Sequence, residues 1–142
     1  MKVRECTVED FPGVLAQLEQ LWPDLELDPV KLAGVFSAYL ETEADIPFCA
    51  TSAGLIVGFA SLNVRNSLWR SGRIAYLDIL VVDEAHRRQG IGAALIDWAA
   101  RAACDLGCEY VELDSAFHRS GAHEFYESLG FERSGIMFGK PL

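Results

Sequence analysis

A glycine-rich turn between two apolar stretches is the part of the 142-residue sequence whose residue types and spacing are most suited to chemistry. An apolar run that ends at Val82 is followed by Arg87 and Arg88, and then by Gly90 and Gly92 at the start of the next apolar stretch. Glycines at these positions let the backbone turn tightly and bring its N–H groups close to a ligand. A helix that begins here adds the positive end of its dipole. The pattern therefore predicts a cradle for an anionic group, specifically a pyrophosphate.

Two better-known phosphate-binding loops do not fit this turn. No Gly-Lys-Ser or Gly-Lys-Thr is present, which excludes a P-loop, and residues 90–95 lack the small residue that ends a dinucleotide-binding fingerprint. An ordinary helix start without a ligand is the alternative interpretation. Arg-x-x-Gly-x-Gly directly after a buried strand and before a strongly apolar helix favours pyrophosphate binding.

Two carboxylates stand in or at the end of apolar, strand-like runs. Asp78 interrupts one such run and Asp114 ends the next. A carboxylate in a buried strand is costly unless it is paired or used, so each is a candidate for substrate contact or proton transfer. The structural alternative for each is an ion pair with an arginine: Arg65, Arg73 or Arg119.

The elements that must position these residues form one α/β domain over residues 1–142, with the predicted order βααβββαβαβ. Alternation predicts a first strand at 2–6, after which Thr7 and Asp10 resemble a capping box, and Asp28 can cap a second helix. Further strands are predicted at 48–52, 55–64, 74–82, 110–114 and 131–138, and further helices at 90–106 and 121–129. Crossover helices between the later strands predict parallel pairing there, beside an antiparallel meander from the first half.

Composition narrows the classes of partner. Twelve Lys plus Arg against 21 Asp plus Glu give a net charge of −9, which disfavours nucleic acid and anionic membranes and favours cationic ligands. No apolar stretch approaches the roughly 20 residues of a membrane span, and no signal region is evident, so a cytoplasmic protein is expected. None of the cysteines forms a Cys-x-x-Cys pair and the histidines share no metal-ligand spacing, so buried thiols and no metal site are expected. The four cysteines are Cys6, Cys49, Cys104 and Cys108.

The glycine-rich turn resembles motif A of the GCN5-related N-acetyltransferases, in which Gln/Arg-x-x-Gly-x-Gly/Ala is matched here by Arg87, Gly90 and Gly92. Residues 122–131 resemble motif B of that family. Because the predicted element order is also the family's, the resemblance covers almost the whole chain. It implies a single-domain acyl-CoA N-acyltransferase fold, with a mixed central sheet that splays at the cofactor cleft and with flanking helices.

The resemblance also implies roles for residues around this cleft. Acetyl-CoA is the implied cosubstrate, in a V-shaped opening between the strand ending near Val82 and the strand ending near Asp114. Tyr126 occupies the family's usual position for the general acid that protonates the departing thiolate, and its structural alternative is packing beside Phe125. The expected cofactor-binding residues are Leu80, Val81, Val82, Arg87, Arg88, Gln89, Gly90, Ile91, Gly92 and Ala93.

The acceptor is expected to be a small-molecule amine. Such an amine must lose a proton before it attacks the thioester, and Asp78 and Asp114 are the candidate catalytic carboxylates beside Tyr126. Trp22 and these acids resemble aminoglycoside 6'-N-acetyltransferases, which implies an aminoglycoside-like or polyamine-like acceptor. The tail resembles aminoalkylphosphonate N-acetyltransferases, in which case Arg119 would hold an anionic group.

Other readings of the acceptor side stay open in the sequence. A protein or peptide amine and a non-catalytic coenzyme A-binding module are the further alternatives. Trp69 could also wall a substrate pocket, and a homodimer is expected because dimers are common in the family. The expected substrate-binding residues are Trp22, Asp78, Asp114 and Arg119.

Overall fold

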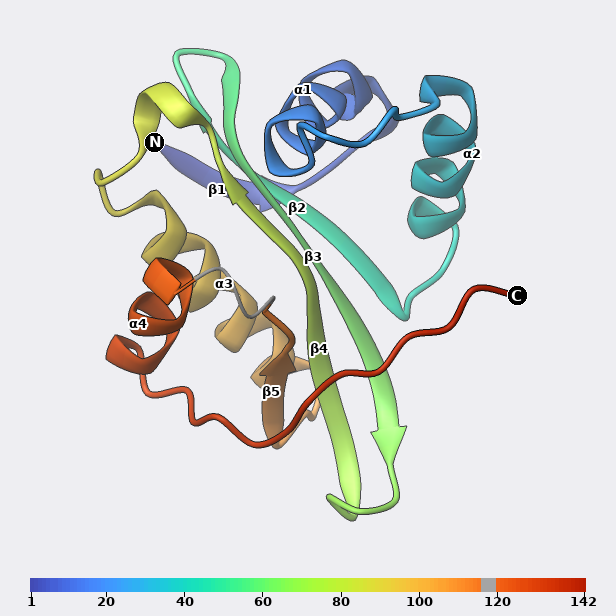
Figure 1. The fold of residues 1–142 in the computed structure, drawn as a ribbon, viewed down its shortest axis with the longest axis vertical. Helices are drawn as coiled ribbons and strands as arrows, with labels where there is room; N and C mark the ends of the chain where they lie inside the picture. Colours follow the sequence, from blue (N-terminus) through green and yellow to red (C-terminus); the bar gives the residue numbers. More distant parts are fainter. Residues whose placement is uncertain (116–119) are drawn as a thin grey trace.

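One mixed five-stranded sheet forms the centre of the computed structural model, which describes residues 1–115 and 120–142 (Figure 1). The sheet has the strand order β1-β2-β3-β4-β5. Strands β1 to β4 are antiparallel neighbours, and β4 pairs with β5 in parallel. The predicted α/β architecture with a mixed sheet is therefore confirmed. The strands are β1 (Lys2–Glu5), β2 (Asp45–Ser52), β3 (Leu55–Ser67), β4 (Gly72–Val82) and β5 (Tyr110–Leu113).

Helices cover both faces of this sheet. On one side lie α1 (Phe11–Leu21) and α2 (Pro29–Leu40), and on the other lie α3 (Ile91–Asp105) and α4 (Ser120–Ser128) (Figure 1). Two short 3-10 turns, η1 (Val8–Asp10) and η2 (Glu84–His86), precede α1 and α3. Within the described residues, no helix has both the length and the apolar content that crossing a membrane requires.

Strand alternation divides the core into two clusters, one on each face of the sheet. On the α3 face, Phe48 is fully buried and stacks on Trp98 with ring centroids 4.5 Å apart. The cluster on the α1–α2 face contains Cys6, Val14, Leu18, Phe36, Cys49, Phe59 and Val81. The sheet is thus packed on both faces along the middle of β2 and β3 and along β4 from Ala75 onward.

A β-bulge in β4 changes this alternation where the candidate site begins. The register with β3 shifts between Leu77 and Ile79, which makes Asp78 an extra residue in β4. Leu77 packs on the α3 face, whereas Ile79 packs on the α1–α2 face. Asp78 also faces that second side, because its carboxylate accepts a hydrogen bond from Tyr39 of α2. The bulge therefore turns two successive side chains to one face.

The predicted final strand at 131–138 is not formed. Residues 131–142 contain no helix or strand, and Ile136, Met137 and Phe138 are 63%, 69% and 90% exposed. A strand forms only where its backbone pairs with the edge of another strand. The pattern of side chains along the chain does not specify that pairing. The prediction of a closing strand is therefore wrong for the described residues.

Candidate active site

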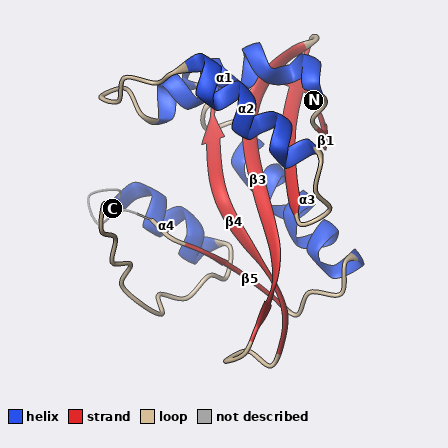
Figure 2. Cartoon of the chain, turned by 90° about the vertical axis from the view of Figure 1, so that its right-hand side faces the viewer, coloured by secondary structure: helices blue, strands red, loops and turns tan. Residues whose placement is uncertain are grey.

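The cleft lies where β4 and β5 separate. The two strands pair only from Ile74 with Tyr110 to Leu77 with Leu113. Beyond that point β5 runs toward α4 while β4 continues upward past α1, as Figure 2 shows. Within residues 1–115 and 120–142, no strand pairs with Asp78–Val82 on the β5 side, so these residues leave backbone N–H and C=O groups of β4 available to a ligand there.

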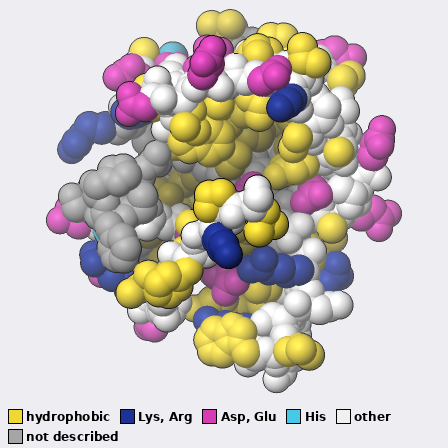
Figure 3. All heavy atoms as spheres, turned by 45° about the vertical axis from the view of Figure 1, so that its right-hand side comes forward, with side chains coloured by type: hydrophobic (Ala, Val, Ile, Leu, Met, Phe, Trp, Pro, Cys, Tyr) yellow, Lys and Arg dark blue, Asp and Glu magenta, His cyan; other side chains and the backbone are white. Residues whose placement is uncertain are grey.

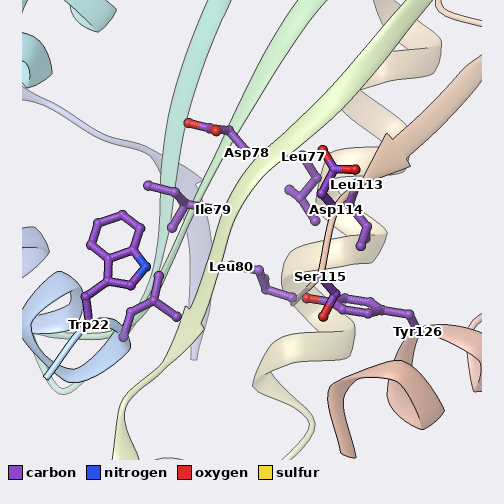
Figure 4. Close-up of a pocket in the computed structure, with 10 residues that line it drawn as sticks. Trp22, Leu77, Asp78, Ile79, Leu80, Leu113, Asp114, Ser115 and Tyr126 are labelled. Atoms are coloured by element: carbon purple, nitrogen blue, oxygen red, sulfur yellow. The ribbon is translucent and has the colours of Figure 1, made fainter. Parts of the chain in front are cut away.

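The opening between the strands is a cleft of about 310 Å³. Figure 4 shows that its side chains come from α1, β4, the end of β5 and α4. The molecule is also hollowed on the face drawn in Figure 3, where hydrophobic side chains form walls and acidic side chains lie around them. The residues that line the cleft are Leu21, Trp22, Leu77, Asp78, Ile79, Leu80, Leu113, Asp114, Ser115 and Tyr126.

Both predicted carboxylates line this cleft, and each is bonded to a tyrosine. The hydroxyl of Tyr39 donates to Oδ2 of Asp78 at 3.1 Å, and the hydroxyl of Tyr76 donates to Oδ2 of Asp114 at 2.6 Å. Neither tyrosine was singled out by the sequence, because each pair joins residues far apart in the chain. In both pairs Oδ1 accepts no hydrogen bond from the described part of the chain and can meet a ligand.

The tyrosines are donors and not bases in this arrangement. Partial burial and the charge of Asp78 raise the pKa of Tyr39 to about 12. Burial and the hydrogen bond to Asp114 raise the pKa of Tyr76 still more strongly. Both phenols therefore keep their protons at neutral pH, and each holds one carboxylate oxygen in place.

The arginines that were the structural alternative do not reach these carboxylates. Arg65 forms an ion pair with Glu112 at 2.9 Å, and Arg73 donates to the carbonyl oxygen of Leu106 at 2.8 Å. Within the described residues, no ion pair involves Asp78 or Asp114. Arg119 was also predicted to bind substrate, and it lies outside the described residues.

Tyr126 projects from α4 into the opposite wall of the cleft. Its ring packs on Phe125 and Phe131, with centroid distances of 5.5 and 5.9 Å. Its hydroxyl points into the cleft beside Leu80 and Ser115 (Figure 4). The packing interpretation of Tyr126 is therefore confirmed, and its role as general acid stays a prediction.

The two tryptophans differ in their placement. Trp22 lies at the end of α1, lines the cleft, and also packs against the core cluster on the α1–α2 face (Figure 4). Trp69 lies in the hairpin between β3 and β4, is 73% exposed, and stacks on Arg70 at 3.9 Å. It does not line the cleft, so the suggestion that Trp69 walls the substrate pocket is wrong.

The glycine-rich turn has the backbone form of an anion-binding loop. Gly90 is the N-cap of α3 with φ of +80°, and Arg88 has φ of +62°, so both lie in the left-handed region. A non-glycine residue held there costs about 1–3 kcal/mol, a strain typical of functional loops. The amides in the first turn of α3 have no carbonyl partner within the helix, and together with this turn they form a concave set of donors. An anionic phosphate fits such a set.

Gly92 has a packing reason to lack a side chain, in addition to the cofactor contact that the motif predicts. A Cβ built at Gly92 would lie 3.1 Å from the ring of Phe125 on α4. The absence of a side chain therefore allows α3 and α4 to pack closely behind the turn. Gly90, whose surroundings are open and whose φ is positive, is the glycine that the turn itself requires.

A link from α1, which no sequence pattern indicates, holds the start of this turn. Nε2 of Gln20 donates to Oδ1 of Asp83 at 2.8 Å, and Oε1 of Gln20 accepts from the amide of Glu84 at 2.8 Å. Hydrogen bonds from Gln20 and from His86 lower the pKa of Asp83 to about 2, so this carboxylate is ionised at neutral pH. The helix that carries Trp22 into the cleft is thereby bonded to the loop that leads into the turn.

Comparison with known proteins identifies the family. The profile of the acetyltransferase (GNAT) family matches residues 7–131. The chain is similar to a glucosamine 6-phosphate N-acetyltransferase of Trypanosoma brucei brucei, with 33% identity over 92% of this chain and 88% of that protein. It is also similar to an aminoglycoside N(6')-acetyltransferase type 1 of Klebsiella aerogenes, with 28% identity over 99% of this chain and 96% of that protein.

A solved structure agrees with this result. The crystal structure of a Trypanosoma brucei acetyltransferase matches with a TM-score of 0.80 and 29% identity, and the match covers 99% of each chain. The fold, the profile match and the two relatives therefore lead to one conclusion. The chain belongs to the GNAT acetyltransferase family and is an acetyl-CoA-dependent N-acetyltransferase.

Proposed function

We propose that this enzyme acetylates a primary amine of a small cationic molecule, held between Asp78 and Asp114. The observation that carries the proposal is the pair of carboxylates in the cleft, each fixed by one tyrosine with its second oxygen left for a ligand. Within the described residues, no Lys or Arg lines the cleft. An acceptor with more than one ammonium group, such as an aminoglycoside or a polyamine, matches this charge.

On the donor side, the residues present fit acetyl-CoA. The left-handed turn at Arg88 and Gly90 and the first amides of α3 offer donors for the pyrophosphate. The guanidinium of Arg87 is exposed beside this turn, with Nε bonded to the carbonyl oxygen of Val82 at 3.3 Å. The unpaired edge of β4 from Leu80 to Val82 is suited to hydrogen bonds with the amides of the pantetheine arm.

The reaction makes two demands on proton transfer. The acceptor ammonium loses a proton before its nitrogen forms a bond with the thioester carbon, and the thiolate released when the C–S bond breaks gains one. We assign the first transfer to the carboxylate of Asp78 or Asp114, which accepts the proton directly or through a water molecule. We assign the second to the hydroxyl of Tyr126, which lines the same cleft.

An anionic acceptor is the competing proposal. The relative with 33% identity is named for glucosamine 6-phosphate, which carries a phosphate in addition to its amine. Such an acceptor needs a cation in the cleft, and Arg119 is the candidate that the sequence offers. Acetylation of a cationic acceptor should therefore depend on the carboxylates and not on Arg119, whereas acetylation of an anionic acceptor should depend on Arg119 and not on the carboxylates.

A panel of amines assayed by release of free thiol from acetyl-CoA tests the choice. The panel contains an aminoglycoside, a polyamine, glucosamine 6-phosphate, an aminoalkylphosphonate and a peptide N-terminus. Asp78→Asn and Asp114→Asn should each lower kcat/KM for the cationic acceptor by roughly 10-fold to 150-fold, the effect of losing one charge-assisted hydrogen bond. The KM for acetyl-CoA should stay nearly unchanged.

Glu112→Gln is the matched control, because this carboxylate stands on β5 outside the cleft and pairs with Arg65. Its acceptor kinetics should equal those of the wild type. The cationic acceptor would be rejected if the enzyme had its highest kcat/KM for a phosphorylated amine, if Arg119→Ala lost this activity, and if Asp78→Asn left it unchanged. Loss of thermal stability alone in both Asn variants, with normal acceptor kinetics, would reduce the carboxylates to structural groups.

Tyr126→Phe tests the general acid. The change removes one hydroxyl and keeps the ring contacts with Phe125 and Phe131. Turnover should fall roughly 100-fold or more while coenzyme A affinity is kept. Near-wild-type turnover, with chemistry shown to be rate-limiting, would leave Tyr126 with a packing role only.

A homodimer and a cytoplasmic location, which the sequence also suggested, stay predictions.

A further inference from the structure

A second group of reactive side chains lies away from the cleft, at the edge of the sheet. Sγ of Cys6, Sγ of Cys49 and a carboxylate oxygen of Asp10 all lie within 4.8 Å of one another. The register of β1 with β2 places Arg4 opposite Cys49, and the amide of Cys6 bonds to the carbonyl oxygen of Pro47 at 2.9 Å. The two thiols therefore meet diagonally across the strand pair, and the turn at η1 brings Asp10 to them.

Both thiols are removed from solvent. Cys49 is 0% exposed and Cys6 is 7% exposed, and both are free cysteines. They are close enough for Cys6 to donate a hydrogen bond to Cys49. Zn²⁺, a borderline-soft metal ion, binds Cys thiolates and also accepts carboxylate oxygens as ligands.

The carboxylate of Asp10 is already oriented. Its Oδ2 accepts hydrogen bonds from Nη1 of Arg4 at 2.7 Å and from the amide of Thr7 at 2.7 Å. Its Oδ1 accepts one described hydrogen bond, from Nη2 of Arg4 at 2.9 Å, which leaves one of the lone-pair directions of that oxygen open. Metal-binding carboxylates are held in this way by a second layer of donors.

The charges balance with and without a divalent ion. In the metal-free state Arg4 neutralises Asp10. When a divalent ion binds, the two thiols release two protons, and two thiolates with the Asp10 carboxylate match the charge of the ion and of Arg4. A buried group of charges needs this neutrality.

A second cavity reaches Cys6. Cys6 lies in the wall of a second cavity of about 780 Å³, between the end of α2, the edge of β2 and the end of α3. This cavity gives space for water as a fourth ligand on the Cys6 side, as in zinc sites with three protein ligands. Its walls hold five carboxylates against one cation, Arg101, and this excess of negative charge favours entry of a cation; the carboxylates are Glu5, Glu41, Glu43, Asp45 and Asp105.

We propose that Cys6, Cys49 and Asp10 form a site for one thiophilic divalent metal ion, Zn²⁺ in preference to harder ions. The sequence predicted no metal site, because these residues do not share a ligand spacing along the chain. Their meeting depends on the pairing of β1 with β2. The ion would join the end of β1, the start of α1 and the middle of β2. The proposal is independent of the acetyltransferase cleft, since none of the three residues lines it.

The test uses the whole chain, kept reduced and freed of metal with a chelator. Titration with Co²⁺ should give thiolate-to-cobalt charge-transfer absorption that saturates at one equivalent, and Zn²⁺ should remove it by displacement. Zn²⁺ should also raise the melting temperature relative to the chelated protein. Absence of this absorption in folded, fully reduced protein would overturn the proposal.

Variants assign the ligands. Cys6→Ser should weaken Co²⁺ binding at least 100-fold, and Asp10→Asn should weaken it by a smaller factor. Cys104→Ser, which removes an exposed thiol of α3, is the matched control and should bind Co²⁺ as the wild type does. Cys49 is fully buried, so Cys6→Ser, checked for folding by circular dichroism, is the primary variant. Unchanged binding in folded Cys6→Ser, or its loss in Cys104→Ser, would also overturn the proposal.

Discussion

Replacement of Gln20 by leucine tests whether α1 helps to build the pyrophosphate turn. The side chain keeps its approximate size, while both hydrogen bonds, to Asp83 and to the amide of Glu84, are lost. A bond to a charged group contributes about 1.5–3 kcal/mol and a neutral one about 0.5–1.5 kcal/mol. Because the loop is partly exposed, we take the low ends, which together give about 2 kcal/mol, or roughly 30-fold in an equilibrium constant.

The assay is calorimetric titration with coenzyme A, which binds without turnover. We expect the Kd to rise by up to roughly 30-fold, because the loop must be ordered again when the ligand binds. Glu19→Leu, at an exposed position next to Gln20 on the same helix, is the matched control and should bind as the wild type does. A Kd within about twofold of the wild type in folded Gln20→Leu would refute the coupling, since roughly 0.4 kcal/mol is too little for two lost hydrogen bonds.

Three further predictions concern the backbone, the pH dependence and the core. Gly90→Ala should destabilise the fold by about 1–2 kcal/mol because of the positive φ, whereas Gly34→Ala in the middle of α2, with open space around it, should be neutral or stabilising by thermal melting. The native pKa of Asp83 lies below its ordinary value of 3.8, at about 2, so its contribution to stability is complete above the ordinary value. The difference in unfolding free energy between the wild type and Asp83→Asn should therefore shrink as the pH falls from about 4 to about 2 in urea titrations. Ser61 is fully buried and its hydroxyl has no hydrogen-bond partner among the described residues, so Ser61→Ala should raise the unfolding free energy by about 1 kcal/mol.

The local parts of the fold were predictable from the sequence. The start of α2 was found because its signal is contained in neighbouring residues: the carboxylate of Asp28 accepts from the amides of Val30 and Lys31, and Pro29 takes the first helical position. The start of β2 was missed because Asp45 and Pro47 do not look like strand residues. Asp45 is held there by its bond from Asn63 on β3, at 2.8 Å, which no local pattern shows.

The candidate site divides in the same way. Asp78, Asp114 and Tyr126 were identified from their types and their places at strand ends and in a motif, and all three line the cleft. Tyr39 and Gln20 were not identified, because each acts on a residue that lies far away in the sequence and close only in the fold. A polar side chain on an otherwise amphipathic helix gives no sign of its partner until the helix is packed.

The short pairing of β5 makes the two walls of the cleft unequal in local stability. β4 is bonded to β3 along nearly its whole length, whereas β5 has four residues, all bonded to one neighbour, and is followed by α4 and a tail without regular structure. Segments with few bonded neighbours open more often than the rest of a domain. Amides of β5 and α4 should therefore exchange with deuterium faster than those of β3 and β4. The carboxylate of Asp78 then belongs to a rigid wall, and the hydroxyl of Tyr126 to one that can move toward and away from it.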